Sequence, residues 1–130
     1  MDGGVDSRSR TGRTGEDIAA EYLAAKGMKL IAKNFRTKGG EIDLIMRDGD
    51  FLVFVEVKTR VYATQQSAFD AISRAKRTRI SKTAVAYLNE IAAFESPCRF
   101  DVVVIVGALP DVRIEHYRNA FEFAARNYFI

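Results

Sequence analysis

Four charged side chains stand in two neighbouring segments whose other residues are mostly apolar. Glu41 and Asp43 interrupt the first segment, and Glu56 and Lys58 end the second. Acidic residues are depleted in β-strands, and their charges are costly to bury unless something pairs with them. Oxygen ligands of this kind suit Mg²⁺ or Mn²⁺. A lysine on the same face could contact an attacking water, so this set could serve metal-assisted hydrolysis.

The two segments are predicted to form a β-hairpin, because the sequence Asp-Gly-Asp at 48–50 is a strong turn signal. A turn at 48–49 would set Asp43 diagonal to Glu56, whereas a turn at 49–50 would set the two residues opposite each other. Opposite residues of an antiparallel pair face the same side of the sheet. Both turns therefore place all four charged residues on one face.

Two helical residues are predicted to lie near this face. Lys76 falls near the centre of the apolar stripe of a long helix, where it could reach the site or extend its stem to solvent at the edge of the core. Glu16 lies on the shoulder of the stripe of the first helix, where it could join the other acids or stabilise the helix dipole. Lys58 itself could form only a structural ion pair with a glutamate.

The charged residues need a framework, and the pattern predicts an α/β fold. A mixed β-sheet flanked by helices is expected, in the order α-β-β-β-α-β-β. The first helix begins after Thr14 and runs to about residue 26, with Asp17 in its first turn. Strands are predicted at 29–36, 41–47, 51–60, 99–106 and 112–117, and a long helix at 68–94. Residues 120–130 are predicted to form a short amphipathic helix or a turn.

Length and composition indicate one globular domain. The chain has 130 residues, of which 48% are hydrophobic and 28% are charged, and we expect a single nuclease-like domain at 14–130 after a disordered basic arm at 1–13. The longest apolar run, 102–109, is far shorter than the ~20 residues that a membrane-spanning helix needs. The single Cys98 excludes an internal disulfide. A cytoplasmic protein without a membrane partner is therefore expected.

Basic residues are concentrated in two parts of the chain, the N-terminal arm with Arg8, Arg10 and Arg13 and a longer stretch further on. Lys and Arg total 20 against 17 Asp and Glu, and residues 71–89 contain no acid. Such a cluster attracts the phosphates of nucleic acid, although a helix face that is merely solvated has the same composition. The candidate nucleic-acid-binding residues are Arg60, Arg74, Lys76, Arg77, Arg79 and Lys82.

Other catalytic chemistries find no support in the sequence. His116 is the only histidine, and no Gly-x-Ser-x-Gly motif accompanies it. One cysteine and one histidine are too few for a zinc site. Walker A and dinucleotide-binding motifs are absent.

Several short motifs together resemble those of the YraN-like family, a set of small bacterial proteins that are predicted endonucleases distantly similar to archaeal Holliday-junction resolvases. The resemblance covers about residues 12–107 and rests on Gly15-Glu16, Asn34-Phe35-Arg36, GEIDLI at 40–45, FVEVKTR at 54–60, Lys76 and Arg99-Phe100-Asp101. It implies a restriction-endonuclease-like fold with a PD-(D/E)xK site. Ile42 stands where that motif usually has a proline, a residue that does not ligate metal.

The resemblance also implies roles for individual residues. Asp43 would be the first acid of the motif, Glu56 the second and Lys58 its lysine, while Glu16 would be the helix-borne acid of resolvase-like members. Three further residues match the family without an assigned role: Glu41, Lys76 and Asp101.

The expected function is therefore that of a Mg²⁺- or Mn²⁺-dependent endonuclease acting on structured or branched DNA. Asp43, Glu56 and Glu16 would bind the metal, with the Val57 carbonyl as a further ligand, and Lys58 would orient the attacking water. A homodimer would suit symmetrical cleavage of a branched substrate. Two alternatives remain: a non-catalytic nucleic-acid-binding module with the same fold, and a scaffold protein in which the charged cluster only stabilises the fold.

Overall fold

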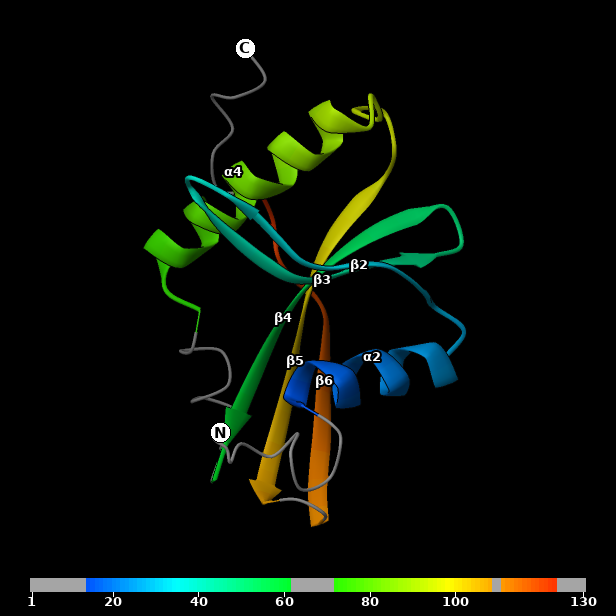
Figure 1. Cartoon of the computed structure of the whole chain (residues 1–130), viewed down its shortest axis with the longest axis vertical. Helices are drawn as coiled ribbons and strands as arrows, with labels where there is room; N and C mark the ends of the chain where they lie inside the picture. The colour runs from blue at the N-terminus through cyan, green and yellow to red at the C-terminus, as the bar shows by residue number, and fades with distance from the viewer. Residues whose placement is uncertain (1–13, 62–71, 109–110, 124–130) are drawn as a thin grey trace, which may run out of the picture.

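A computed structural model describes residues 14–61, 72–108 and 111–123 of the chain (Figure 1). The elements follow one another as α2 (Gly15–Ala25), β2 (Lys29–Thr37), β3 (Gly40–Asp48), β4 (Phe51–Arg60), α4 (Arg74–Glu90), β5 (Cys98–Ala108) and β6 (Asp111–Phe121). The predicted α/β class and the order α-β-β-β-α-β-β are confirmed. The arm predicted at 1–13 lies outside the described residues, as does the end of the chain from residue 124.

The five strands form one mixed sheet in the order β2-β3-β4-β5-β6. Only β4 and β5 run parallel. The connection through α4 returns the chain to the end of the sheet at which β4 begins, so β5 starts from the same end. Asp48 pairs with Phe51 across the β3–β4 turn, so the turn lies at 49–50, and Gly49 adopts a positive φ of 61° there. The observed register is therefore the one of the two predicted that sets Asp43 opposite Glu56.

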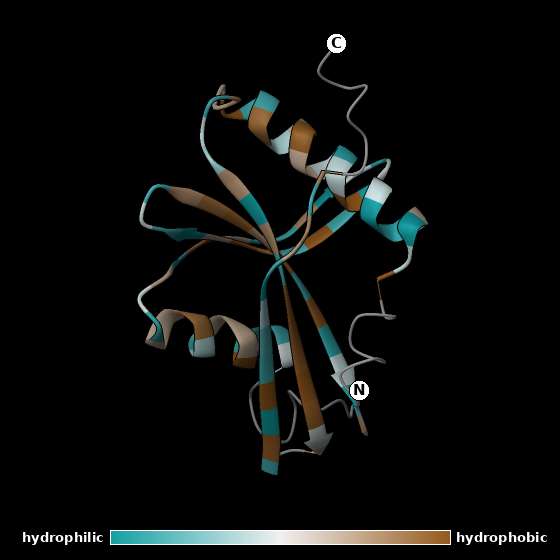
Figure 2. Ribbon diagram, turned by 180° about the vertical axis from the view of Figure 1, so that it is seen from behind, coloured by the Kyte–Doolittle hydropathy of each residue, from teal (hydrophilic) through white to brown (hydrophobic). Residues whose placement is uncertain are grey.

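Each face of the sheet is covered by one helix. Alternate residues of β4 divide between the faces: Phe54 packs in the core beneath α4, and Val53 and Val55 pack in the core beneath α2. Strand β5 is buried along most of its length, and Figure 2 shows its long apolar stretch beside β6, where polar and apolar residues alternate. The sheet thus separates two hydrophobic cores, one beneath each helix.

Three predicted boundaries differ from the structure by more than two residues. The start predicted for the long helix, residues 68–71, lies outside the described residues. Residues 72 and 73 are not helical, and α4 begins at Arg74, where the Ser73 side chain caps it by accepting from the backbone N–H of Lys76. It ends at Glu90 rather than at residue 94, and Ala92 follows with a φ of 55°. The helix or turn predicted from residue 120 is wrong for residues 120 and 121, which extend β6 because Phe121 stacks on Phe100 in the core.

Strand β3 leaves β4 partway along the sheet. The β3–β4 pairs end at Leu44 with Val55, although β4 continues beside β5 as far as Arg60. The tip of the β2–β3 hairpin turns towards α4 instead (Figure 1), and a Cβ placed on Gly40 would lie only 3.0 Å from Thr83 Oγ1. Among the described residues, β4 therefore has no strand partner on its β3 side from Glu56 onward.

None of the helices in the described part of the chain is both long and apolar enough to cross a membrane.

Candidate active site

Asp43 lies at the point where the β3–β4 ladder ends. Its Oδ2 accepts a hydrogen bond of 2.8 Å from the backbone N–H of Val57, so this carboxylate takes the place of a β3 backbone carbonyl as the acceptor for β4. Burial and the negative charge of Glu56 raise the pKa of Asp43 to about 7, and Glu16 and Glu41 add to the effect. The site holds Asp43 where its charge is unfavourable without a cation.

Glu56 lies beside it on the α4 face of β4 and is only 6% exposed. Its Oε2 is 3.0 Å from Lys58 Nζ and 2.7 Å from Lys76 Nζ. Burial and then the nearby Lys76 lower the pKa of Lys58. Burial also acts to lower the pKa of Lys76, but the ion pair with Glu56 outweighs it and raises that pKa. Lys76 thus belongs to the site as well as to the basic helix.

Glu16 reaches the same region from the first turn of α2. A Cβ on Gly15 would meet Thr59 Cγ2 at 2.9 Å, so glycine allows the start of this helix to lie against β4. Burial and then Glu41 raise the pKa of Glu16, to which Glu56 also contributes. The helix begins with the predicted cap, because Thr14 and Asp17 form a reciprocal capping box.

Asn34 belongs to one of the motifs of the family resemblance, but sequence reasoning gave it no role in the site. It adopts a φ of 54° within β2 and stands across from Asp43 in the β2–β3 register. Its Nδ2 donates a hydrogen bond of 3.0 Å to Glu16 Oε1. An asparagine inside a strand was the available signal, because asparagine is depleted in strands yet tolerates positive φ.

The chemistry of these donors fits a hard divalent cation. Asp43 and Glu56 offer carboxylate oxygens, and their mutual repulsion is relieved when a cation lies between them. The described residues nevertheless contain no group of three His, Cys, Asp or Glu side chains arranged to hold a metal ion. Glu16 is bonded to Asn34, and Glu41 pairs with Arg36 at 3.4 Å. Asp43 and Glu56 also have partners, but they are the two acids at the end of the β3–β4 ladder, and the charge of Glu56 helps to raise the pKa of Asp43. They are therefore the pair that a cation between them would stabilise most.

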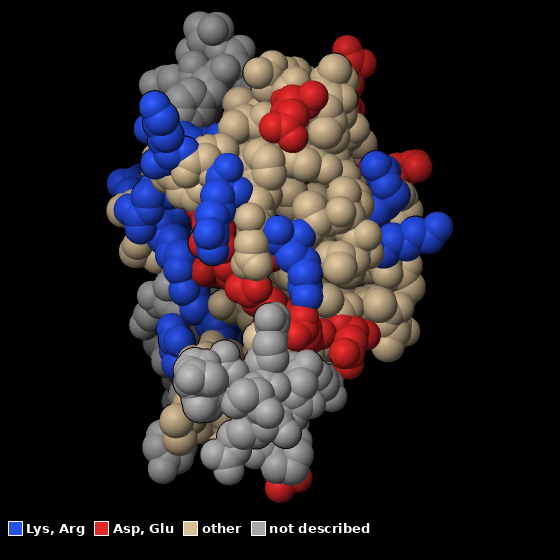
Figure 3. Space-filling view, in the orientation of Figure 1, with Lys and Arg blue, Asp and Glu red and all other residues tan. Residues whose placement is uncertain are grey.

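The basic residues divide into three kinds of position. Arg74, Arg79 and Lys82 are exposed along α4. Arg77 Nε donates to the Ile72 carbonyl at 3.1 Å and its guanidinium lies over the Phe121 ring, and Arg60 donates to the Thr59 carbonyl. Lys76 pairs with Glu56. Figure 3 shows Lys and Arg side chains gathered along one flank of the molecule with acidic side chains among them.

Asp101 does not join the site. It is fully buried on the α2 side of the sheet, where it accepts from Arg99, from His116 Nε2 at 2.7 Å and from the backbone N–H of Asn119 at 3.0 Å. Asn119 lies at the irregularity of the β5–β6 ladder and has a φ of 51°. Asp101 thus accepts the hydrogen bond of a backbone N–H at the point where the β5–β6 ladder is interrupted.

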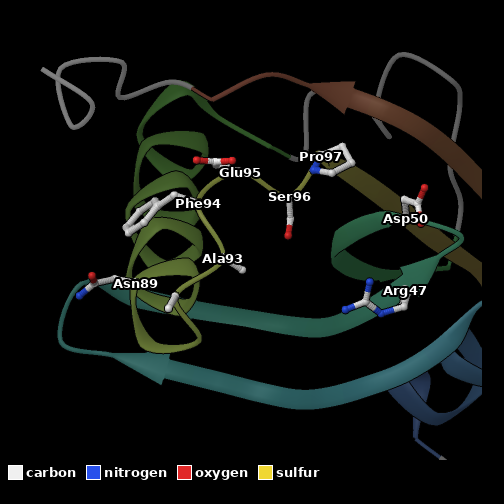
Figure 4. Close-up of a pocket in the computed structure, with 9 residues that line it drawn as sticks. Arg47, Asp50, Asn89, Ala93, Phe94, Glu95, Ser96 and Pro97 are labelled. Atoms are coloured by element: carbon white, nitrogen blue, oxygen red, sulfur yellow. The ribbon is translucent and has the colours of Figure 1, made fainter.

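A hollow of about 820 Å³ lies elsewhere on the molecule (Figure 4). Arg47 and Asp50 of the β3–β4 hairpin face Asn89 and the segment 92–97 across it. None of the predicted site residues lines this hollow. The candidate active site is therefore defined by the converging charges at the end of the β3–β4 ladder.

The raised pKa of Asp43 has a consequence for stability. Its folded-state pKa of about 7 exceeds the ordinary aspartate value of 3.8, so the folded protein retains a proton between about pH 4 and 7 that the unfolded chain has lost. The free energy of unfolding should fall as the pH rises through this range. Urea unfolding in EDTA at pH 5 and 8 should show a fall of at least about 1 kcal/mol from this group. The Asp43→Asn variant should lose this contribution, so its free energy of unfolding should fall less between pH 5 and 8. If the variant showed the same pH dependence as the wild type, Asp43 would not be the group responsible.

Comparison with known proteins supplies a family. The model of UPF0102, an uncharacterised protein family, matches residues 15–105, the span that contains every site residue described above. A UPF0102 protein of Rhodococcus opacus (strain B4) is 47% identical over 111 residues, which cover 85% of this chain and 94% of the relative. UPF0102 proteins of Geobacter sulfurreducens and Symbiobacterium thermophilum are 46% and 45% identical, over 87% and 86% of this chain and 89% and 96% of the relatives.

Proposed function

Because the chain belongs to the uncharacterised UPF0102 family, we propose its function from the site itself. We infer that the protein is a metal-dependent phosphodiesterase that cleaves nucleic acid, with structured or branched DNA as its substrate. The main support is the convergence of charges at the end of the β3–β4 ladder. There, Asp43 has a pKa raised to about 7 beside a buried Glu56 that contacts two lysines. Titratable groups with such shifts are concentrated at functional sites.

Each residue then has a chemical task. Asp43 and Glu56 would hold the cation with their carboxylate oxygens, and the Val57 carbonyl is available as a neutral ligand. A divalent cation supplies Lewis acidity and lowers the pKa of bound water. Lys58, already paired with Glu56, would orient the attacking water or stabilise the charge that develops on the phosphate.

The exposed cations of α4 would bind the backbone of the substrate, which makes the affinity dependent on salt. Each phosphate contact contributes about −0.9 to the slope of log K against log salt on duplex DNA. We expect the combined replacement of Arg74, Arg79 and Lys82 by alanine to reduce the slope by about 2 to 3 units.

Fluorescence anisotropy in EDTA at several salt concentrations would measure this slope without cleavage. Replacement of Lys29, an exposed lysine at the far end of the β2–β3 hairpin, is the matched control and should change the slope by less than about 1 unit. If the triple variant kept the wild-type slope, α4 would not be the surface that contacts phosphates.

A cleavage screen tests the proposed activity. Duplex, single-stranded, flap and four-way DNA, together with RNA, would be incubated with the protein in Mg²⁺, Mn²⁺ or EDTA. We expect cleavage only with metal, and most rapidly on a branched or structured substrate. Cleavage that persists in EDTA, or its absence from every substrate, would contradict the proposal.

One observation favours a second candidate, a nucleic-acid-binding module without catalysis. Both lysines contact the same oxygen of Glu56, so the protein's own side chains already compensate the charge of this buried carboxylate. Such a module would bind nucleic acid equally well with Mg²⁺ and with EDTA and would cleave nothing. The screen above, accompanied by binding measurements, distinguishes the two candidates.

A further inference from the structure

We infer that Lys76 competes with the divalent cation for Glu56, acting as an internal counter-ion that has to leave the carboxylate before the metal binds there. This inference rests on the proposed function, because it concerns the same metal site. This role for Lys76 differs from phosphate binding by the basic residues of α4, and the acid-acid-lysine motif of the site does not include it.

The first observation is that Lys76 and Lys58 contact one oxygen. Lys76 Nζ lies 2.7 Å from Glu56 Oε2, closer than Lys58 Nζ at 3.0 Å. An oxygen that already contacts two ammonium groups has little capacity left for a cation. A metal ion that bound Glu56 beside both lysines would also be repelled by two positive charges at short range. The same repulsion would act on a metal ion at the other carboxylate oxygen, Oε1, so we expect at least one lysine to move away when the metal binds.

The second observation shows which lysine can leave. The side chain of Lys58 is 17% exposed and lies on the same strand as Glu56, whereas the side chain of Lys76 is 30% exposed and reaches Glu56 from α4. The backbone of Lys76 is held by the Ser73 cap, but its four-carbon stem can rotate into solvent. Glu56 is itself 7% exposed in its side chain and has no comparable freedom.

A third observation concerns the charge of the competitor. The Lys76 side chain carries its positive charge 2.7 Å from Glu56 Oε2. The Lys76 ammonium therefore supplies in the metal-free protein part of the positive charge that the two carboxylates require. The start of α4 would then be tied to Glu56 without metal and untied when metal is bound.

Mn²⁺ binding tests this competition. Isothermal titration at pH 7.5 would compare the wild type with Lys76→Met, Lys76→Arg and Lys29→Met. We expect Lys76→Met to bind Mn²⁺ at least about tenfold more tightly, because the competing charge is gone. Lys76→Arg keeps the charge and Lys29→Met removes one far from the site, so both should stay within about twofold of the wild type. Lys76→Gln is measured beside them in case the methionine variant does not fold.

The outcomes separate this inference from the proposed function. If Lys76→Met and Lys76→Gln bound Mn²⁺ no more tightly than the wild type, the inference alone would be overturned. The same holds if Lys29→Met gained as much affinity as Lys76→Met, because the gain would then reflect overall charge. If neither the wild type nor any variant bound Mn²⁺, the inference and the metal-dependent function would both fail.

Discussion

Asp43→Asn is expected to reduce metal-dependent cleavage by more than about a hundredfold while leaving the protein folded. Loss of even an outer partner of a metal ligand typically costs about 10- to 100-fold, and this substitution removes a negatively charged ligand itself. Asparagine keeps an oxygen that can accept the hydrogen bond from Val57 N–H. It also relieves the repulsion that raises the pKa of Asp43 to about 7. The melting temperature in EDTA at pH 8 should therefore equal or exceed that of the wild type.

The matched control is Asp50→Asn, which makes the same chemical change in the exposed β3–β4 turn. It should leave the cleavage rate within about twofold of the wild type, since surface changes of this kind alter stability by less than about 0.5 kcal/mol. A purely structural role for Asp43 makes the opposite prediction, namely a variant that melts lower in EDTA yet still cleaves. That result would refute the catalytic role.

Asp101→Ala is expected to lower the free energy of unfolding by roughly 3–5 kcal/mol, the usual effect of removing one partner from a buried ion pair. Arg99 is 7% exposed and Asp101 is fully buried, so alanine would leave a buried guanidinium with one acceptor fewer. It would also remove the acceptors of His116 Nε2 and of the Asn119 backbone N–H. Urea unfolding at pH 7 measures the loss, and Asp111→Ala at the exposed start of β6 should change it by less than about 0.5 kcal/mol.

The same network predicts a dependence on acid. Burial alone would raise the pKa of Asp101, but the hydrogen bonds from His116 and Arg99 outweigh it and lower that pKa. The stabilisation by Asp101 is therefore complete above the pKa of an unfolded aspartate and is lost as the pH falls below about 4. If Asp101→Ala cost less than about 1 kcal/mol at pH 7, the role of this network in holding the β5–β6 irregularity would be wrong.

The position of the site could be predicted from the sequence because it depends on local rules. Strand alternation and a two-residue turn were enough to place Asp43 and Glu56 on one face, whichever of the two registers applied. The observed pairing of Asp48 with Phe51 selects one register. Turn chemistry alone could not do so, because Asp-Gly and Gly-Asp are both favourable hairpin turns.

Other features depended on tertiary contacts and could not be predicted in this way. The ion pair of Lys76 with Glu56 depends on how closely α4 packs against β4, and the spacing of residues in the sequence does not specify that distance. The positive φ of Asn34 becomes meaningful only once β2 lies opposite Asp43. The family resemblance singled out Asp101 beside the site residues, whereas the fold separates it from them and gives it Arg99 and His116 as partners.

Direct measurement of bound metal tests the central claim, that Asp43 and Glu56 together hold a divalent cation, without knowledge of the substrate. Electron paramagnetic resonance of free Mn²⁺ would be recorded while wild type, Asp43→Asn or Glu56→Gln is titrated in. We expect the wild type to remove Mn²⁺ from solution and each variant to bind it more than about tenfold more weakly. If both variants, shown to be folded, bound Mn²⁺ as the wild type does, or if the wild type bound none, the metal site proposed here would be contradicted.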